Sequence, residues 1–165
     1  MYDIKALYEA ENVQDAIRLL TEHPQAQIIA GGSDVLVQIR EGKRAGVELV
    51  SIYGLDELRG VSLEEDETLR IGSLTSFSHI TKNELIQKYI PVLGEAVDMV
   101  GGPQIRNIGT IGGNTCNGVT SADSASTLFA LDAIIELTGP EGIRRLPIRE
   151  FYIKAGKVDI RQGEL

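Results

Sequence analysis

The sequence predicts an α+β protein with two successive subdomains, a small parallel βαβαβ subdomain over residues 1–55 and a second one over residues 56–165 with helices and a mostly antiparallel sheet. Three observations predict this class. Apolar residues switch between helical and strand periodicity in the first fifty residues. Hairpin patterns begin after about residue 55. The length of 165 residues suits one domain or a compact pair of subdomains.

In the first subdomain, Asn12 is a typical N-cap residue, and apolar side chains recur after it at helical spacing until Pro24 ends the run. The further elements expected here are a strand over residues 27–30, a helix over residues 34–41 and a strand over residues 48–52. This alternation of helix and strand predicts a parallel sheet with right-handed crossovers.

The second subdomain begins with two short alternating segments around an acidic turn, which is typical of a hairpin. Pro91 suits the first position of a helix, because its missing N–H would have no partner there anyway. The elements expected are a hairpin of residues 61–63 and 68–71, helices over residues 76–82, 84–89, 91–100 and 122–131, and a hairpin of residues 133–138 and 143–146.

Charge and hydropathy exclude several classes of partner. The formal net charge is −8, since 24 acidic residues outnumber 16 basic ones, whereas proteins that bind nucleic acid carry basic surfaces. No run of 18 apolar residues occurs, and the amino terminus lacks a basic region followed by a hydrophobic stretch. We therefore expect a cytoplasmic protein that binds neither nucleic acid nor a membrane.

The residues that could bind metal are few and scattered. The single cysteine, Cys116, excludes an intrachain disulfide and a metal site built from this chain's thiols, and we expect it to be a small buried residue rather than a redox thiol. His23 and His79 lack ligand spacing. No metal site is predicted.

Glycine is the unusual feature of the composition. The chain has 18 glycines among 165 residues, about 11 % against an average of roughly 7 %. Six of them lie in residues 101–118. Between Met99 and Ala122, the only side chain expected to be charged is that of Arg106. A long segment that is uncharged and rich in glycine is typical of a buried ligand loop rather than of a solvated linker.

A first glycine loop follows the predicted strand over residues 27–30. Gly31 and Gly32 permit a sharp turn and a close approach of a ligand to the backbone, while Ser33 and Asp34 can cap the next helix. Such a turn suits a phosphate or pyrophosphate. The pattern is neither a Walker A loop nor Gly-x-Gly-x-x-Gly, and a tight turn without a ligand is an equally good interpretation.

The second glycine loop covers residues 106–124. It offers backbone amides together with the side chains of Thr110, Asn114 and Ser121 as partners for an anion. Asp123 either caps a helix or accepts hydrogen bonds from ribose or ribityl hydroxyls. Two glycine loops far apart in the sequence can bind one dinucleotide.

Four segments together resemble the FAD-binding subunit of the xanthine dehydrogenase family of molybdenum hydroxylases, and its purine branch most of all. They are residues 29–34 (Ile-Ala-Gly-Gly-Ser-Asp), 102–107 (Gly-Pro-Gln-Ile-Arg-Asn), 110–114 (Thr-Ile-Gly-Gly-Asn) and 116–125 (Cys-Asn-Gly-Val-Thr-Ser-Ala-Asp-Ser-Ala). The resemblance covers residues 1–165 and implies the FAD-binding fold of the PCMH type.

The resemblance also implies a set of cofactor ligands. In that family the two glycine loops bind the FAD pyrophosphate, an aspartate at the position of Asp123 also contacts the cofactor, and an apolar residue at the position of Leu165 contacts the flavin. The FAD ligands implied for this chain are Gln27, Ile28, Ile29, Ala30, Gly31, Gly32, Ser33, Asp34, Gly109, Thr110, Ile111, Gly112, Gly113, Asn114, Asp123 and Leu165. No catalytic residue is implied, because the cofactor carries the chemistry.

The function implied is that of an electron-relay subunit. Its expected partners are a molybdopterin-binding large subunit and a small subunit with [2Fe-2S] clusters, from which electrons pass through FAD to NAD+ as the expected acceptor. The family's C-terminal third domain is absent from this chain, which is expected to be either a fragment or the product of a short gene. The alternatives are another flavoenzyme of the PCMH type, such as a reductase of a cell-wall sugar nucleotide, and a truncated, non-catalytic interaction domain.

Overall fold

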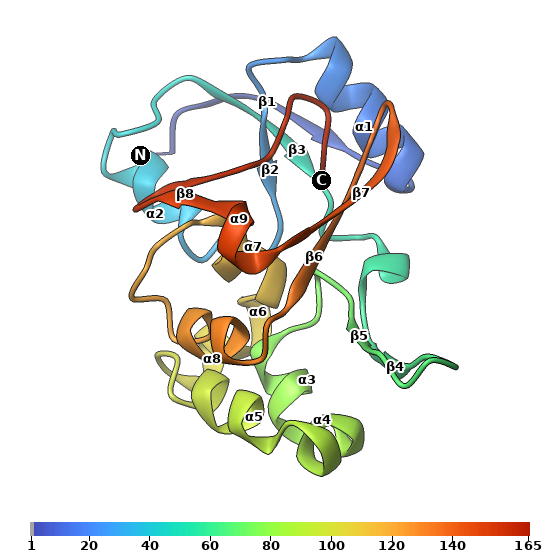
Figure 1. Ribbon diagram of the computed structural model, residues 1–165. Coiled ribbons are helices and arrows are strands. Elements are labelled where there is room, and N and C mark those ends of the chain that lie inside the picture. The colour runs from blue at the N-terminus through green and yellow to red at the C-terminus, as the bar shows by residue number, and fades with distance from the viewer. Residues whose placement is uncertain (1) are drawn as a thin grey trace. The chain divides into compact units, whose positions relative to one another are not determined.

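The computed structural model describes residues 2–165, which form two compact units (Figure 1). Unit 1 contains the residues up to Glu57 together with Glu136–Arg145 and Ile160–Leu165, and unit 2 contains Leu58–Ile135 and Leu146–Asp159. The sequence pattern assigned all of residues 56–165 to the second subdomain. The sequence pattern predicts the hairpin of residues 133–146 but not where it packs. In the structure this hairpin runs from unit 2 into unit 1 and back.

Unit 1 is built on a parallel sheet of three strands in the order β1-β3-β2. Its elements in chain order are β1 (Ile4–Glu9), α1 (Val13–Glu22), β2 (Gln27–Ile29), α2 (Val35–Arg40) and β3 (Val47–Ser51). The βαβαβ prediction is therefore confirmed. The carboxyl end of β2 leads directly into the first glycine loop.

Helix α1 forms where the sequence predicts it. The Asn12 side chain accepts a hydrogen bond from the Asp15 N–H at 2.9 Å, which satisfies one of the free donors at the helix start. The apolar face of α1 buries Leu19 and Leu20 against Val50 of β3. Apolar burial on one face thus holds α1 on the sheet.

Unit 2 combines short strand pairs with short helices. Within it, β4 pairs with β5 and β8 pairs with β9, whereas the pair of β6 and β7 lies mostly in unit 1. From the boundary with unit 1 onward, the elements are the 3-10 helix η1 (Asp56–Leu58), β4 (Val61–Leu63), β5 (Leu69–Ile71), α3 (Phe77–Lys82), α4 (Glu84–Tyr89), α5 (Pro91–Asp98), α6 (Pro103–Ile108), α7 (Ile111–Cys116), α8 (Ala125–Ala130), β6 (Ile134–Gly139), β7 (Gly142–Pro147), α9 (Ile148–Phe151), β8 (Tyr152–Lys154) and β9 (Lys157–Val158).

Helices α3, α4 and α5 gather at one end of this unit (Figure 1). Their buried faces form a core with residues from α7, α8 and α9. The buried members of this core are Phe77, Ile80, Ile86, Leu93, Val97, Ile111, Leu128 and Ile148. The glycine-rich segment is thereby tied into the core through Ile111, the first residue of α7.

The glycine-rich window is more regular than the sequence predicts. It was expected to be a long loop, and the structure instead places two six-residue helices in it, α6 and α7. Pro103 opens α6, and the Thr110 side chain caps α7 by accepting a hydrogen bond from the Gly113 N–H at 3.1 Å. These start signals outweigh the low helix propensity of two adjacent glycines.

Candidate functional site

The first glycine loop forms the turn between β2 and α2 in unit 1. Gly32 has a φ of +74°, a left-handed conformation that suits glycine, and its carbonyl accepts the Leu36 N–H at 3.0 Å. Within residues 2–165, the N–H groups of four successive residues from Gly31 to Asp34 donate to no protein acceptor. A row of unpaired backbone donors is the arrangement by which loops bind anions.

Polar side chains form a network beside this loop. The Asp34 carboxylate accepts a hydrogen bond from the Gln38 amide, and the Arg44 guanidinium donates to the side-chain oxygens of both Gln38 and Gln27. Asp34 occupies the N-cap position of α2 but makes no side-chain capping bond, contrary to its expected capping role. Its carboxylate is bound to Gln38 instead.

Arg44 is a residue that the sequence does not single out. It lies in the turn between α2 and β3, far from any glycine motif, and only the fold brings its guanidinium to the side chain of Gln27. Through Gln38, which binds the Asp34 carboxylate, this permanent positive charge is linked to the end of the glycine loop.

The second glycine loop surrounds the start of α7 in unit 2. Thr110 forms a β-bridge with Ser76, and the N–H groups of Ile111 and Gly112 donate to the carbonyls of Thr75 and Ser73 at 3.0 and 2.8 Å. The Gly113 N–H donates to the Thr110 hydroxyl. These three amides thus serve the protein's own structure, which differs from the expectation that they face a pyrophosphate.

Gly112 allows an unusually close approach of two chain segments. A Cβ built on it would lie 2.6 Å from the Ser73 Cβ and 2.7 Å from the Ser73 carbonyl oxygen, closer than carbon atoms pack. No side chain fits there without movement of the backbone. The diglycine motif of α7 is therefore explained at Gly112 by packing within unit 2.

Asn114 and the Asp123 segment lie together in unit 2. The Ser124 hydroxyl donates to the Asn114 side-chain oxygen at 2.5 Å, and the Ser124 side chain is fully buried. The neighbouring Asp123 is exposed. Ser124, not Asp123, stands at the N-cap of α8, so the capping role considered for Asp123 does not apply. Its carboxylate remains available to a ligand.

Leu165 belongs to unit 1. Its side chain packs against the cluster of Leu19, Leu20 and Val50, and its backbone exchanges hydrogen bonds of 2.8 and 2.9 Å with Thr138. These contacts give Leu165 a structural role within the unit. Its contact with a flavin remains a prediction.

Cys116 ends α7, and the residue as a whole is exposed, so the expectation of a buried residue is wrong. The surrounding protein still desolvates the thiolate and raises the pKa of Cys116 to about 11, which keeps the thiol protonated near neutral pH. Among residues 2–165, no three His, Cys, Asp or Glu side chains gather as a metal site. No helix in this part of the chain is long and apolar enough to cross a membrane.

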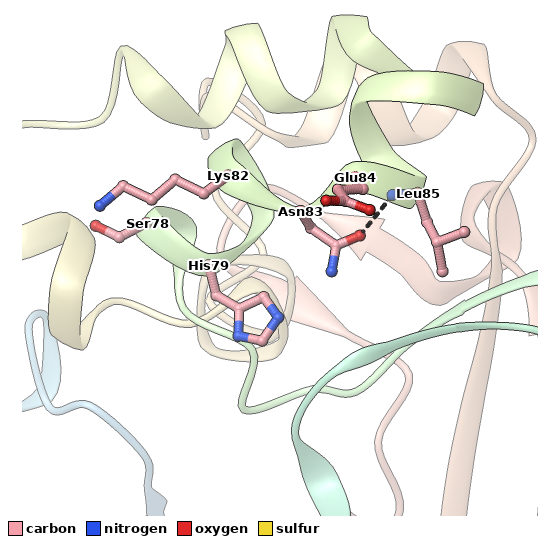
Figure 2. A pocket seen from close by; sticks show the side chains of 6 residues that line it. All are labelled: Ser78, His79, Lys82, Asn83, Glu84 and Leu85. Carbon is pink, nitrogen blue, oxygen red and sulfur yellow. Dashed lines mark hydrogen bonds between the residues drawn. The ribbon is translucent and has the colours of Figure 1, made fainter.

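Two hollows in unit 2 are lined by none of the implied FAD ligands. The larger, about 630 Å³, lies where α3 meets α4 and is lined by Ser78, His79, Lys82, Asn83, Glu84 and Leu85 (Figure 2). The Asn83 side chain there caps α4 by accepting the Leu85 N–H at 3.0 Å. The smaller hollow, about 340 Å³, is lined by Thr120, Ala125, Ser126, Phe129, Tyr152 and Lys154.

A parallel βαβαβ unit with a glycine turn at the end of a strand, joined to an α+β unit with a second glycine motif, is typical of a nucleotide-binding domain. Comparison with known proteins gives the family. The model of the FAD binding domain in molybdopterin dehydrogenase matches residues 2–165. The chain belongs to this family, and FAD is its cofactor.

Two relatives show how far the similarity extends. The chain is 43 % identical, over all 165 residues, to the xanthine dehydrogenase FAD-binding subunit of Escherichia coli O157:H7, and it covers 56 % of that protein. It is 32 % identical over 147 residues to the nicotinate dehydrogenase FAD-subunit of Eubacterium barkeri, a match that covers 88 % of this chain and 49 % of that one. The chain spans about half the length of these relatives.

A solved structure supports the fold. The structure of reconstituted CO dehydrogenase from Oligotropha carboxidovorans superposes with a TM-score of 0.93 at 30 % identity. The match covers 97 % of this chain and 56 % of the other. The prediction of an α+β fold of the FAD-binding type is thereby confirmed.

Proposed function

We propose that this chain is the FAD-binding part of a molybdenum hydroxylase of the xanthine dehydrogenase type. The observation that carries this proposal is the 43 % identity to the xanthine dehydrogenase FAD-binding subunit of Escherichia coli O157:H7, which extends over the whole of this chain. Identity to the nicotinate dehydrogenase subunit is lower, at 32 %. The purine branch is therefore the best supported within the family.

The first glycine loop fits the diphosphate of FAD. Within residues 2–165, its consecutive N–H groups at Gly31, Gly32, Ser33 and Asp34 are donors without protein partners. The Arg44 guanidinium is linked to the end of the loop through Gln38 and Asp34. The left-handed φ of Gly32 orients these amides. We assign the charge of the cofactor to this loop, within the implied set from Gln27 to Asp34.

The second loop contributes in a different way. Because the N–H groups of Ile111, Gly112 and Gly113 are engaged within the protein, we assign its contacts with FAD to side chains. Asn114 is held by Ser124 and presents its amide group, while the exposed Asp123 carboxylate accepts hydrogen bonds from ribityl or ribose hydroxyls. Gly109 to Gly113 shape this loop.

In the proposed complex the bound FAD supplies one-electron and two-electron exchange between the [2Fe-2S] clusters of a small subunit and NAD+. A molybdopterin-binding large subunit oxidises the substrate. The residues of this chain bind and orient the cofactor, and none of them has to transfer a proton. The hydroxylation itself is therefore assigned to the partner.

The relay is tested in the assembled complex. With wild-type chain, xanthine oxidation should reduce NAD+. With Gly32→Val, NAD+ reduction should fall, while reduction of an artificial acceptor that takes electrons ahead of the flavin should persist. Equal loss of both activities, with FAD still bound, would contradict the assignment of this chain to the last step of the relay.

A further inference from the structure

The smaller hollow of unit 2 is a separate candidate site. Its wall comes from the segment before α8, from α8 itself and from β8. Its volume of about 340 Å³ falls in the range of small-molecule pockets. None of the residues implied as FAD ligands lines it, although Thr120 and Ala125 belong to the segment 116–125 that resembles the family.

Lys154 supplies the charge of this hollow. Its side chain is exposed, and among residues 2–165 no carboxylate lies within ion-pair distance of it. Arg149, which lies 5.9 Å from the Phe129 ring, is instead bound to Asp132 at 2.9 Å. The hollow therefore carries one uncompensated positive charge from its own lining.

The remaining wall is apolar with hydroxyl groups. Thr120 and Ser126 provide hydroxyls that can donate hydrogen bonds, and Ala125 and Phe129 provide apolar surface. The rings of Phe129 and Tyr152 meet edge to face, with centroids 5.2 Å apart. An aromatic ring of a ligand can add to this pair.

Tyr152 carries a buried polar group without a partner. Its hydroxyl oxygen is shielded from solvent and makes no hydrogen bond. Buried hydroxyls are almost always hydrogen-bonded, so this group needs an acceptor. Burial raises the pKa of Tyr152, which keeps the hydroxyl protonated and able to donate.

We propose that this hollow binds a small aromatic carboxylate, with the carboxylate paired to Lys154 and the ring packed on Phe129. One uncompensated cation matches a monoanion, whereas a phosphate dianion calls for an arginine fork or several cations. The hydroxyls of Thr120 and Ser126 supply the neutral donors.

The test uses benzoate as the probe and benzamide as its uncharged counterpart, titrated into the 165-residue chain by calorimetry, with and without saturating FAD. Benzoate should bind, benzamide more weakly, and added FAD should leave the benzoate affinity unchanged. Lys154→Gln should weaken benzoate binding about tenfold or more, since a hydrogen-bonded charge pair is lost. Lys157→Gln, an exposed lysine of β9 outside the lining, should change it less than twofold.

Tyr152→Phe keeps the ring that lines the hollow and removes only the shielded hydroxyl, so it should leave the fold intact and weaken benzoate binding less than Lys154→Gln does. The proposal is overturned by absent benzoate binding at millimolar concentration, by equal effects of Lys154→Gln and Lys157→Gln, or by competition between benzoate and FAD. Absorbance of bound flavin in the same samples reports the proposed function independently.

Discussion

Gly112 is a position where the structure leaves no room for a side chain. A methyl group there would overlap the Cβ of Ser73 at 2.6 Å and its carbonyl oxygen at 2.7 Å. That carbonyl also accepts the Gly112 N–H at 2.8 Å, so the two backbones cannot separate without losing this hydrogen bond. Gly112→Ala therefore perturbs packing and hydrogen bonding together.

The cost follows from these two effects. Overpacking in a tight interior costs about 1–3 kcal/mol, and loss of the Gly112 to Ser73 hydrogen bond adds about 1 kcal/mol. We expect Gly112→Ala to lower the free energy of unfolding by about 2–4 kcal/mol. At an m value of about 2 kcal/mol per M urea, the midpoint shifts down by roughly 1–2 M.

Urea unfolding of the FAD-free chain, followed by circular dichroism, measures this shift. The matched control is Gly102→Ala in the same unit, where the added Cβ meets only the flexible side chain of Gln104 at 3.3 Å and the backbone is extended. This control should unfold within about 0.5 kcal/mol of the wild type. If Gly112→Ala is as stable as Gly102→Ala, the packing explanation of the diglycine motif is wrong.

Two further predictions concern unit 1. Gly32→Val should weaken FAD binding, because a β-branched residue disfavours the left-handed backbone that presents the free N–H groups. The control is Gly42→Val, which carries the same backbone strain at a φ of +77° in open space and should retain FAD. Quenching of flavin fluorescence measures FAD binding by both variants. Arg144 donates two hydrogen bonds to Glu164 at 2.9 and 2.7 Å and lowers the pKa of that carboxyl, so the pair's stability is present above the ordinary pKa of 4.5 and is lost as pH falls through the lowered value. Glu164→Gln should cost about 2 kcal/mol at pH 7 and flatten the loss of stability below pH 4.5, whereas Glu136→Gln, in an exposed pair, should cost under about 0.5 kcal/mol; equal costs in urea unfolding would contradict this.

The elements that the sequence predicts well are those specified by local signals. Asn12 caps α1 as expected, and the switch between strand and helical periodicity is enough to predict the parallel βαβαβ unit. The helices α3, α4 and α5 also begin within a residue of their predicted starts. Caps and periodicity act over a few residues, so a single sequence carries them.

What the sequence does not show depends on contacts between distant residues. Helix α7 forms in spite of two glycines because Thr110 caps it and the Thr75 carbonyl binds its first amide. The pairing of Arg44 with Gln27 joins residues 17 positions apart. The sequence likewise gives no sign that Leu165 packs on α1.

The two glycine motifs combine what the sequence predicts with what only the fold decides. The sequence indicates both loops as candidate ligand-binding segments, and the family match agrees with a nucleotide-binding protein. It does not distinguish glycines that leave amides free, as at Gly32, from one that permits close packing, as at Gly112. That distinction depends on which segment lies opposite, here Ser73.

The most direct test of this account is a titration of the purified 165-residue chain with FAD, followed by the visible spectrum after removal of free cofactor. The account predicts a yellow protein with about one FAD per chain and a flavin spectrum shifted from that of free FAD. A colourless chain that is folded by circular dichroism, and that retains no FAD, would contradict the central claim that these residues alone form a flavin-binding domain.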